Sequence, residues 1–392
     1  MARRYQVYEE KGFNVDPGAG LDAEQASPRL PGRMLSVAFR WRLAAGGVLA
    51  AGLLFLFFRG VDWTALGSTF RSANPVYLLG VVGATALTYL VRAWRWGYLL
   101  APLARVSFPR LFSATVVGFM MGLLVPRAGE IVRPYLVARR HGIRTSAAFA
   151  SIILERLVDL ITVLVLFGLY LYVLPMPRAQ SQGPLLGVLK AAGGLAGLAA
   201  LAVFVVLLGF HLRAEKTMAV VDRILSRFPR RLAGPVSRAL RSFAEGLAVL
   251  KASAGHLLAI LGQSLLVWLS IALAFFCNNR AFGIDLPFHA SFLLISFLTV
   301  GVAIPTPGMV GGFHEFYLLA MTEAFGVGKG AAAAAGIAGH ALTNLPVLLL
   351  GLAFLGGEGL TVGRVAEMIE ETPKETAGAP PVAARIAAGG RR

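Results

Sequence analysis

Apolar blocks of about 20 residues recur along this chain, and a helix of that length crosses the roughly 30 Å hydrocarbon core of a bilayer. Of the 392 residues, 57% are hydrophobic and only 15% are charged, a balance outside the range of soluble globular domains. We therefore predict an all-α fold, a polytopic transmembrane helix bundle. About six blocks are predicted spans, and they are 43–58, 76–100, 147–174, 185–210, 256–278 and 331–355.

Two further apolar segments are interrupted by proline, because 111–125 is followed by Pro126 and 288–304 by Pro305. A second helical segment follows each break. We interpret both pairs as re-entrant helical hairpins, which dip into the membrane and return. Broken backbone at membrane depth is tolerated where protein or a water-filled cavity surrounds it.

The two hairpin regions, 108–174 and 287–355, share an order of events. Each has an apolar arm, a Pro/Gly break followed by a glutamate, a short polar turn and a long span that contains polar residues. An odd number of predicted spans separates the hairpins, so they enter from opposite faces. We therefore predict an inverted repeat, which many secondary transporters build around a midplane site.

The net charge of +17 would suggest nucleic acid in a soluble chain. Lys and Arg accumulate in cytoplasmic loops of membrane proteins, and no nucleic-acid-binding motif is visible, so we expect no nucleic-acid partner. The basic loops 101–110, 127–146 and 211–254 fall on one side when the N-terminus is cytoplasmic. We expect a multi-pass plasma (inner) membrane protein with both termini in the cytoplasm.

The predicted transmembrane domain, 42–356, is flanked by two polar segments. Residues 1–41 are basic with Pro and Gly, and 357–392 are charged with Pro, so we expect both to be disordered and cytoplasmic. Within the domain, apolar positions recur at helical spacing across the basic segment 211–254. This pattern predicts amphipathic helices on the cytoplasmic membrane surface.

Charged residues are concentrated in the apolar stretch 126–159. Charges at membrane depth are costly, and they usually pair, face a polar cavity and serve a function. Glu155 and Asp159 share a helix face, and Arg156 lies three residues before Asp159. Two interpretations stay open and are compatible. One is a charge network that holds the hairpin against the span, and the other is headgroup binding or proton coupling.

A second basic cluster, Arg92 and Arg95 among tryptophans, lies near the inner end of span 76–100. Amphipathic aromatics and snorkelling arginines anchor helices at the membrane interface. Anchoring is one interpretation of the cluster, and contact with a lipid headgroup is the other.

A helix that begins inside the membrane exposes free N–H groups and a positive dipole end, which attract an anion. Glycines after both breaks permit close backbone approach, and arginines suit phosphate or carboxylate. The implied ligand has an anionic headgroup and a lipid tail. The candidate substrate-binding residues are Arg127, Gly129, Glu130, Arg133, Glu155, Arg156, Asp159, Pro307, Gly308, Gly311, Gly312, Glu315, His340 and Asn344.

Motifs of other chemistries are weak or absent in the sequence. Two histidines and a carboxylate without tight spacing are poor support for a metal site, and the single Cys277 excludes an intramolecular disulfide. No Walker loop, nucleophile elbow or HExxH motif occurs. We expect no metal, no cofactor and no enzymatic activity.

The segment 127–133, the run 147–159 and the break 305–315 together resemble the flippase-like family named after the transmembrane region of lysylphosphatidylglycerol synthase. The resemblance covers about 40–355 and implies an inner-membrane protein whose relatives move lipids between leaflets. The site residues to which it points are Arg127, Gly129, Glu130, Arg133, Glu155, Arg156, Asp159, Pro307, Gly308 and Glu315. Met309 stands where relatives commonly have glycine, which could tighten the second break. We expect no soluble aminoacyl-transferase domain after Gly356, so the resemblance does not imply lysyl transfer.

The resulting hypothesis is a flippase or scramblase-like transporter of an anionic amphiphile, such as a phospholipid, a polyprenyl phosphate or a glycolipid precursor. In this hypothesis Arg127 and Arg133 hold the headgroup, and Arg133→Ala abolishes transport without unfolding the protein. The alternative is a non-transporting membrane partner that docks a cytoplasmic lipid-modifying enzyme or glycosyltransferase through 211–254.

Overall fold

The structure, a computed structural model, describes residues 37–59, 63–143, 145–174, 184–227 and 254–357. Within these ranges all regular secondary structure is helical and no strand occurs, which confirms the predicted all-α class. Three helices are long and apolar enough to cross a membrane: α3 (Pro75–Leu100), α9 (Ala254–Ala281) and α12 (Lys329–Gly357). The chain is therefore an integral membrane protein, whereas the total of six spans stays a prediction.

The first half contains α1 (Val37–Phe58), α2 (Trp63–Arg71), α3, α4 (Phe108–Leu124), α5 (Ala128–His141) and α6 (Thr145–Tyr172). Helix α1 begins inside the segment that we expected to be disordered, and α2 occupies part of what we expected to be only a connection. Helix α3 has a sequence-encoded start, since the Asn74 side chain accepts a hydrogen bond from the Val76 N–H and Pro75 occupies the first turn.

The second half contains α7 (Pro184–Leu225), α9, α10 (Ala290–Ala303), η2 (Pro307–Met309), α11 (Gly312–Leu319), the π-helical η3 (Ala320–Ala324) and α12. Helix α7 is interrupted by non-helical backbone at Arg213, close to the predicted end of its span. Of the predicted basic segment 211–254, residues 228–253 lie outside the described ranges, as do 1–36 and 358–392.

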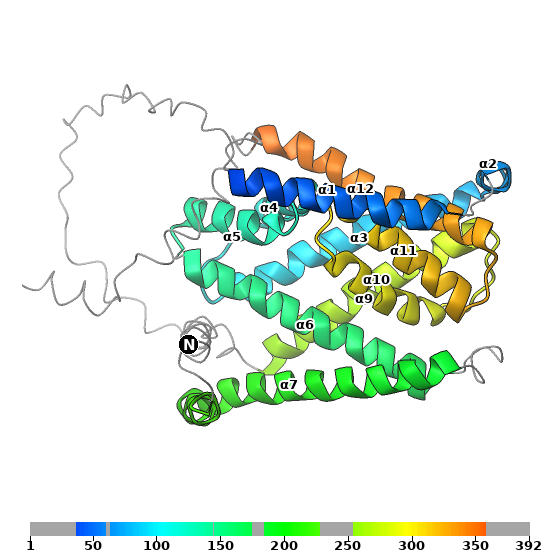
Figure 1. The fold of residues 1–392 in the computed structure, drawn as a ribbon. Coiled ribbons are helices and arrows are strands. Elements are labelled where there is room, and N and C mark those ends of the chain that lie inside the picture. Colours follow the sequence, from blue (N-terminus) through cyan, green and yellow to red (C-terminus); the bar gives the residue numbers. More distant parts are fainter. Residues whose placement is uncertain (1–36, 60–62, 144, 175–183, 228–253, 358–392) are drawn as a thin grey trace, which may run out of the picture. The chain divides into compact units, whose positions relative to one another are not determined.

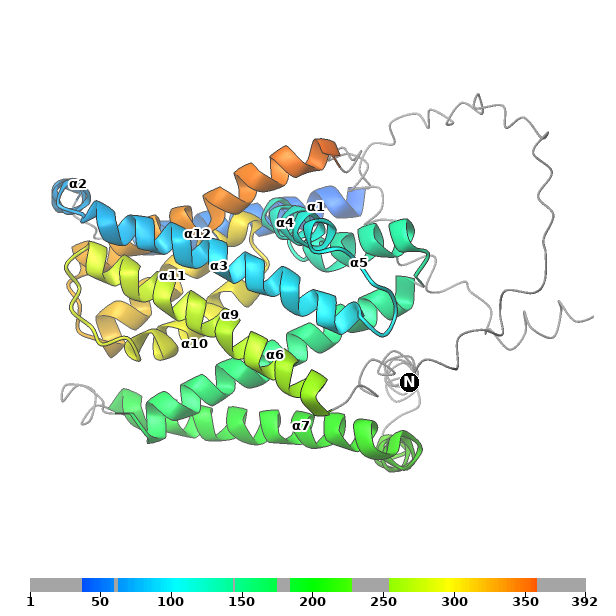
Figure 2. The same cartoon turned by 180° about the vertical axis from the view of Figure 1, so that it is seen from behind.

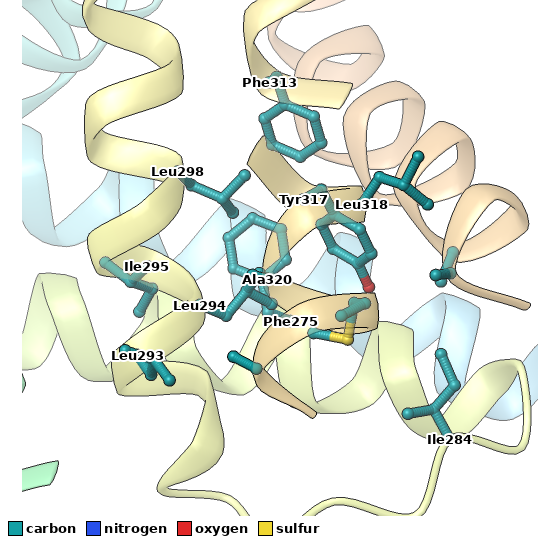
Figure 3. Packing of buried hydrophobic residues seen from close by; sticks show 14 of the residues in the cluster. Phe275, Ile284, Leu293, Leu294, Ile295, Leu298, Phe313, Tyr317, Leu318 and Ala320 are labelled. Carbon is teal, nitrogen blue, oxygen red and sulfur yellow. The ribbon is translucent and has the colours of Figure 1, made fainter. Parts of the chain in front are cut away.

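Helices α3 and α9 lie side by side and form the most extensive helix contact of the described residues (Figures 1 and 2). Around them, α4 packs against α5 and α12, and α10 packs against α11 and α6. Two large apolar cores result, beside a small one between α3 and α9. One is built mainly by α3–α6 around Trp96 and Met120, with residues of α7, α9 and α12. The other is built mainly by α9–α12 around Phe275, Leu294 and Tyr317, with residues of α1, α2 and α6 (Figure 3).

Candidate functional site

Six charged side chains from α3, α5 and α6 gather inside the protein. Five are buried and one, Arg156, is partly exposed. We call this group the charge cluster, and its members are Arg92, Arg95, Arg133, Glu155, Arg156 and Asp159. Buried charges at membrane depth persist only when they are paired or functional.

Glu155 is the centre of one half of the charge cluster. Its carboxylate is fully buried and accepts two hydrogen bonds from Arg133, Nη1 to Oε1 at 3.0 Å and Nη2 to Oε2 at 3.2 Å. Arg156 Nη2 donates to Oε1 at 2.8 Å, and Arg95 Nη2 lies 3.4 Å from the same oxygen. The Arg133 guanidinium also lies over the Trp96 ring, 4.4 Å from its centroid.

Asp159 is the centre of the other half. It accepts hydrogen bonds from Arg95 Nη1 at 2.6 Å, Arg92 Nη1 at 3.4 Å and Trp268 Nε1 at 3.1 Å. Arg95 Nη1 also donates to Ser264 Oγ at 2.7 Å. The carboxylate on α6 therefore joins α3 and α9, the two helices that contact each other most.

Interfacial anchoring is the wrong interpretation for Arg92 and Arg95, because both are buried in the charge cluster. The spacing of these two arginines in the sequence could have indicated that they are buried. Arg92, Arg95, Trp96 and Leu99 recur at helical period and form one buried face of α3. Trp94, off this face, is exposed. Ser264 and Trp268 had no comparable signal, since each is an ordinary residue of an apolar span.

A cavity of about 550 Å³ lies between the two chain breaks. We call it the polar cavity. Its first wall includes Phe119 and five candidate residues, and its second wall is the stretch from Val302 to Thr306 together with Met309. The candidate residues in it are Arg127, Gly129, Glu130, Arg133 and Arg156. Glu155 and Asp159 lie behind these as ion-pair partners of the arginines.

Each hairpin closes on a glycine pair. A Cβ on Gly129 would lie 2.2 Å from the Gly118 carbonyl oxygen, and a Cβ on Gly312 would lie 2.3 Å from that of Gly301. These distances are far below any real contact, so both glycines are needed for helix packing. We expected Gly129, Gly311 and Gly312 to admit a ligand. The observed neighbour of Gly312 is instead α10, and that of Gly311 is α1, through Ala50 and Leu53.

The second break contains three residues in the region of positive φ, Gly308 (+65°), Met309 (+57°) and Gly311 (+87°). This region favours glycine, so a methionine there carries strain. Pro307 and Gly308 form η2 with Met309, and Met309 lines the polar cavity. His340 Nε2 donates to the Gly308 carbonyl at 2.8 Å and so holds the break against α12.

The remaining candidates lie apart from the polar cavity. Glu315 is half-buried on α11, and Asn344 lines a second cavity of about 190 Å³. The rings of His314 and His340 lie 4.6 Å apart. In the described ranges, no group of three or more His, Cys, Asp or Glu side chains is arranged to hold a metal ion.

Comparison with known proteins gave two matches. Residues 43–351 match the family model of the lysylphosphatidylglycerol synthase TM region. The chain is also similar to the glycosyltransferase AglD of Haloferax volcanii, with 26% identity over 331 residues, which cover 78% of this chain and 52% of that protein. This chain thus spans about half the length of that curated relative.

The second match corrects one expectation. We expected no enzymatic activity, and a protein similar over most of this chain is named as an enzyme, which overturns that expectation. The first match extends over most of the chain, including both hairpins and the whole charge cluster. The chain belongs to the family of the lysylphosphatidylglycerol synthase transmembrane region.

Proposed function

We propose that this protein moves an anionic amphiphile between the leaflets of the plasma membrane. One observation carries the proposal: the polar cavity lies between two broken helical hairpins and is lined by Arg127, Arg133 and Arg156. An arginine at membrane depth needs a negatively charged partner, which is either a carboxylate of the protein or a bound anion such as the phosphate of a lipid headgroup. The candidate residues on this cavity hold the headgroup, while Glu155 and Asp159 position the arginines.

We further propose that the hairpins belong to an inverted repeat of a six-span bundle with both termini in the cytoplasm. The glycine pairs support the repeat, because Gly118 and Gly129 are separated by the same number of residues as Gly301 and Gly312. The helix packing supports it too. Helix α4 packs on α12 as α10 packs on α6, and α3 and α9 run in opposite directions (Figures 1 and 2).

Leaflet exchange in proteoliposomes tests transport directly, with a panel of labelled lipids that includes a polyprenyl phosphate. Arg127→Gln is the informative variant, because Arg127 is exposed at the cavity and its loss leaves the charge cluster intact. Arg71→Gln, an exposed arginine on α2, is the matched control. We expect wild type and Arg71→Gln to exchange at least one lipid and Arg127→Gln to be impaired. Folded wild-type protein that exchanges none of the panel contradicts the proposal.

The similarity to a protein named as a glycosyltransferase favours a second candidate, a membrane partner that docks such an enzyme or another lipid-modifying enzyme on the cytoplasmic side. After Arg213, α7 exposes Lys216 and Arg223, and Arg227 is exposed in the turn that follows the helix; these side chains suit an acidic protein surface. Arg230 and Arg231, which we included in this surface, lie outside the described residues. Co-purification of a glycosyltransferase that is lost in Arg223→Gln/Arg227→Gln, without change in exchange, supports docking.

A further inference from the structure

The charge cluster is not neutral. Among the residues that the structure describes, four arginines face two carboxylates, which leaves two positive charges. Arg127 and Glu130 at the polar cavity add one charge of each sign and leave this sum unchanged. Uncompensated charge is costly where the charged groups are buried, as five of the six members of the charge cluster are. The polar cavity is thus matched to a ligand with two negative charges.

Some hydrogen-bond donors of the charge cluster also lack an acceptor. Within the described ranges, the buried Nε atoms of Arg133 and Arg156 have no hydrogen-bond partner, and both side chains line the polar cavity. A buried donor without a partner has lost its hydrogen bonds to water and gained none in the protein, which costs free energy. A terminal phosphate offers three strong acceptor oxygens and a charge of about −1.5 to −2 at pH 7. A phosphodiester carries one charge less.

The second cavity, of about 190 Å³, adjoins the polar cavity and shares part of its wall. Its lining is mostly apolar and includes Phe275, Leu298 and Phe313, which Figure 3 shows in the core around α10 and α11. The second cavity is about a third as large as the polar cavity, which favours one hydrocarbon chain segment over two side by side.

Phe119 stands between the two cavities and lines both. Three arginines surround its ring, with guanidinium carbons 5.1 Å (Arg92), 5.4 Å (Arg133) and 6.0 Å (Arg156) from the centroid. The ring therefore lies in the wall shared by the two cavities, with Arg133 and Arg156 lining the first and Arg92 as the charged residue of the otherwise mostly apolar second cavity. We propose, resting on the transport function above, that the ligand is a phosphate monoester on a single apolar chain, with its phosphate in the polar cavity and its chain past Phe119.

Three probes separate charge from chain number: tetradecyl phosphate, its methyl ester, and dimyristoyl phosphatidate. The first two have the same chain and differ by one phosphate charge and one methyl group, whereas the third is a monoester with two chains. Binding to the full chain in phosphatidylcholine nanodiscs is measured by calorimetry, with empty nanodiscs as the reference. We expect tetradecyl phosphate to bind about tenfold more tightly than its methyl ester at pH 7.5, since one added charge pair is worth on the order of a tenfold change. It should also bind more tightly than dimyristoyl phosphatidate, because the smaller cavity favours a single chain.

Acidification supplies the second test, because the second phosphate pKa is about 6. At pH 5 the advantage of tetradecyl phosphate over its methyl ester should largely disappear. Arg127→Gln, which removes one positive charge, should reduce the advantage at pH 7.5, and Arg71→Gln should not.

Equal affinity for the monoester and its methyl ester overturns the assignment of a dianion. Equal affinity for one-chain and two-chain monoesters overturns the single-chain chamber. Both failures are distinct from failure of the transport proposal. Exchange of diester lipids that depends on Arg127 would leave that proposal standing, and selective binding of the monoester without any exchange would refute transport alone.

Discussion

Arg133 and Glu155 form a two-pronged ion pair across the packing of α5 against α6, with two N–O distances of 3.0 and 3.2 Å. The pair places one arginine in two roles, because the same side chain supports the fold and lines the polar cavity. From the sequence we expected Arg133→Ala to abolish transport without unfolding the protein. The buried pair leads to a different prediction.

Arg133→Ala should lower the free energy of unfolding by about 3–5 kcal/mol, because it leaves the buried Glu155 carboxylate without its main partner. Thermal unfolding of the purified protein in one detergent measures the loss. The double variant Arg133→Met/Glu155→Gln removes both charges and should recover part of it. Equal destabilisation by the single and double variants would show that the pair is not a stabilising unit.

Asp159→Asn should destabilise the protein more than Trp268→Phe. The first change removes the charge that two arginines of α3 share, at a cost of about 3–5 kcal/mol. The second removes one hydrogen bond to a charged group, worth about 1.5–3 kcal/mol. Unfolding in the same detergent ranks the two, and the opposite order would contradict the geometry at Asp159.

The positions of most helices could be predicted from the sequence, because the length of an apolar run and the proline that interrupts it are local features of the chain. The hairpin 111–125 and 130–140 appears as α4 and α5 within a few residues, and the second break falls at Pro305 to Met309 as predicted. Helix α2 was missed because its nine residues carry no long apolar run.

The partners inside the site depend on packing between helices far apart in the chain, which local patterns do not encode. Arg95 and Asp159 are 64 residues apart, and Trp268 lies a further 109 residues along. Gly129 lines the polar cavity, but its contact with Gly118 could not be predicted from the sequence, since that contact is fixed only by how α4 and α5 pack.

Gly129→Ala should open the first hairpin. The added methyl group would lie 2.2 Å from the Gly118 oxygen, so α4 and α5 must separate, and overpacking of this kind costs about 1–3 kcal/mol. Gly122→Ala on the same hairpin is the matched control, because its methyl group would make an ordinary 3.7 Å contact. Thermal unfolding should distinguish the two, and equal stability of the variants would contradict this packing.

Gly312→Ala should have the same effect on the second hairpin, where the Gly301 oxygen lies 2.3 Å from the added methyl position. If the two hairpins are equivalent parts of one repeat, Gly129→Ala and Gly312→Ala should impair stability and leaflet exchange to similar extents. Impairment by only one of the two would show that the hairpins have unequal roles.

Phe119→Ala should join the two cavities, because its ring is part of the wall between them. The enlarged space should admit a second chain, so the affinity for dimyristoyl phosphatidate should rise toward that for tetradecyl phosphate. Phe112→Ala on the same helix is the control, since Phe112 packs against Phe108 and Phe354 away from both cavities. Calorimetry in nanodiscs measures both variants. Phe119→Ala could instead keep the wild-type preference for one chain while Phe112→Ala behaves as wild type. The Phe119 ring would then not limit the number of chains, and that number would be set deeper in the second cavity, near Phe275.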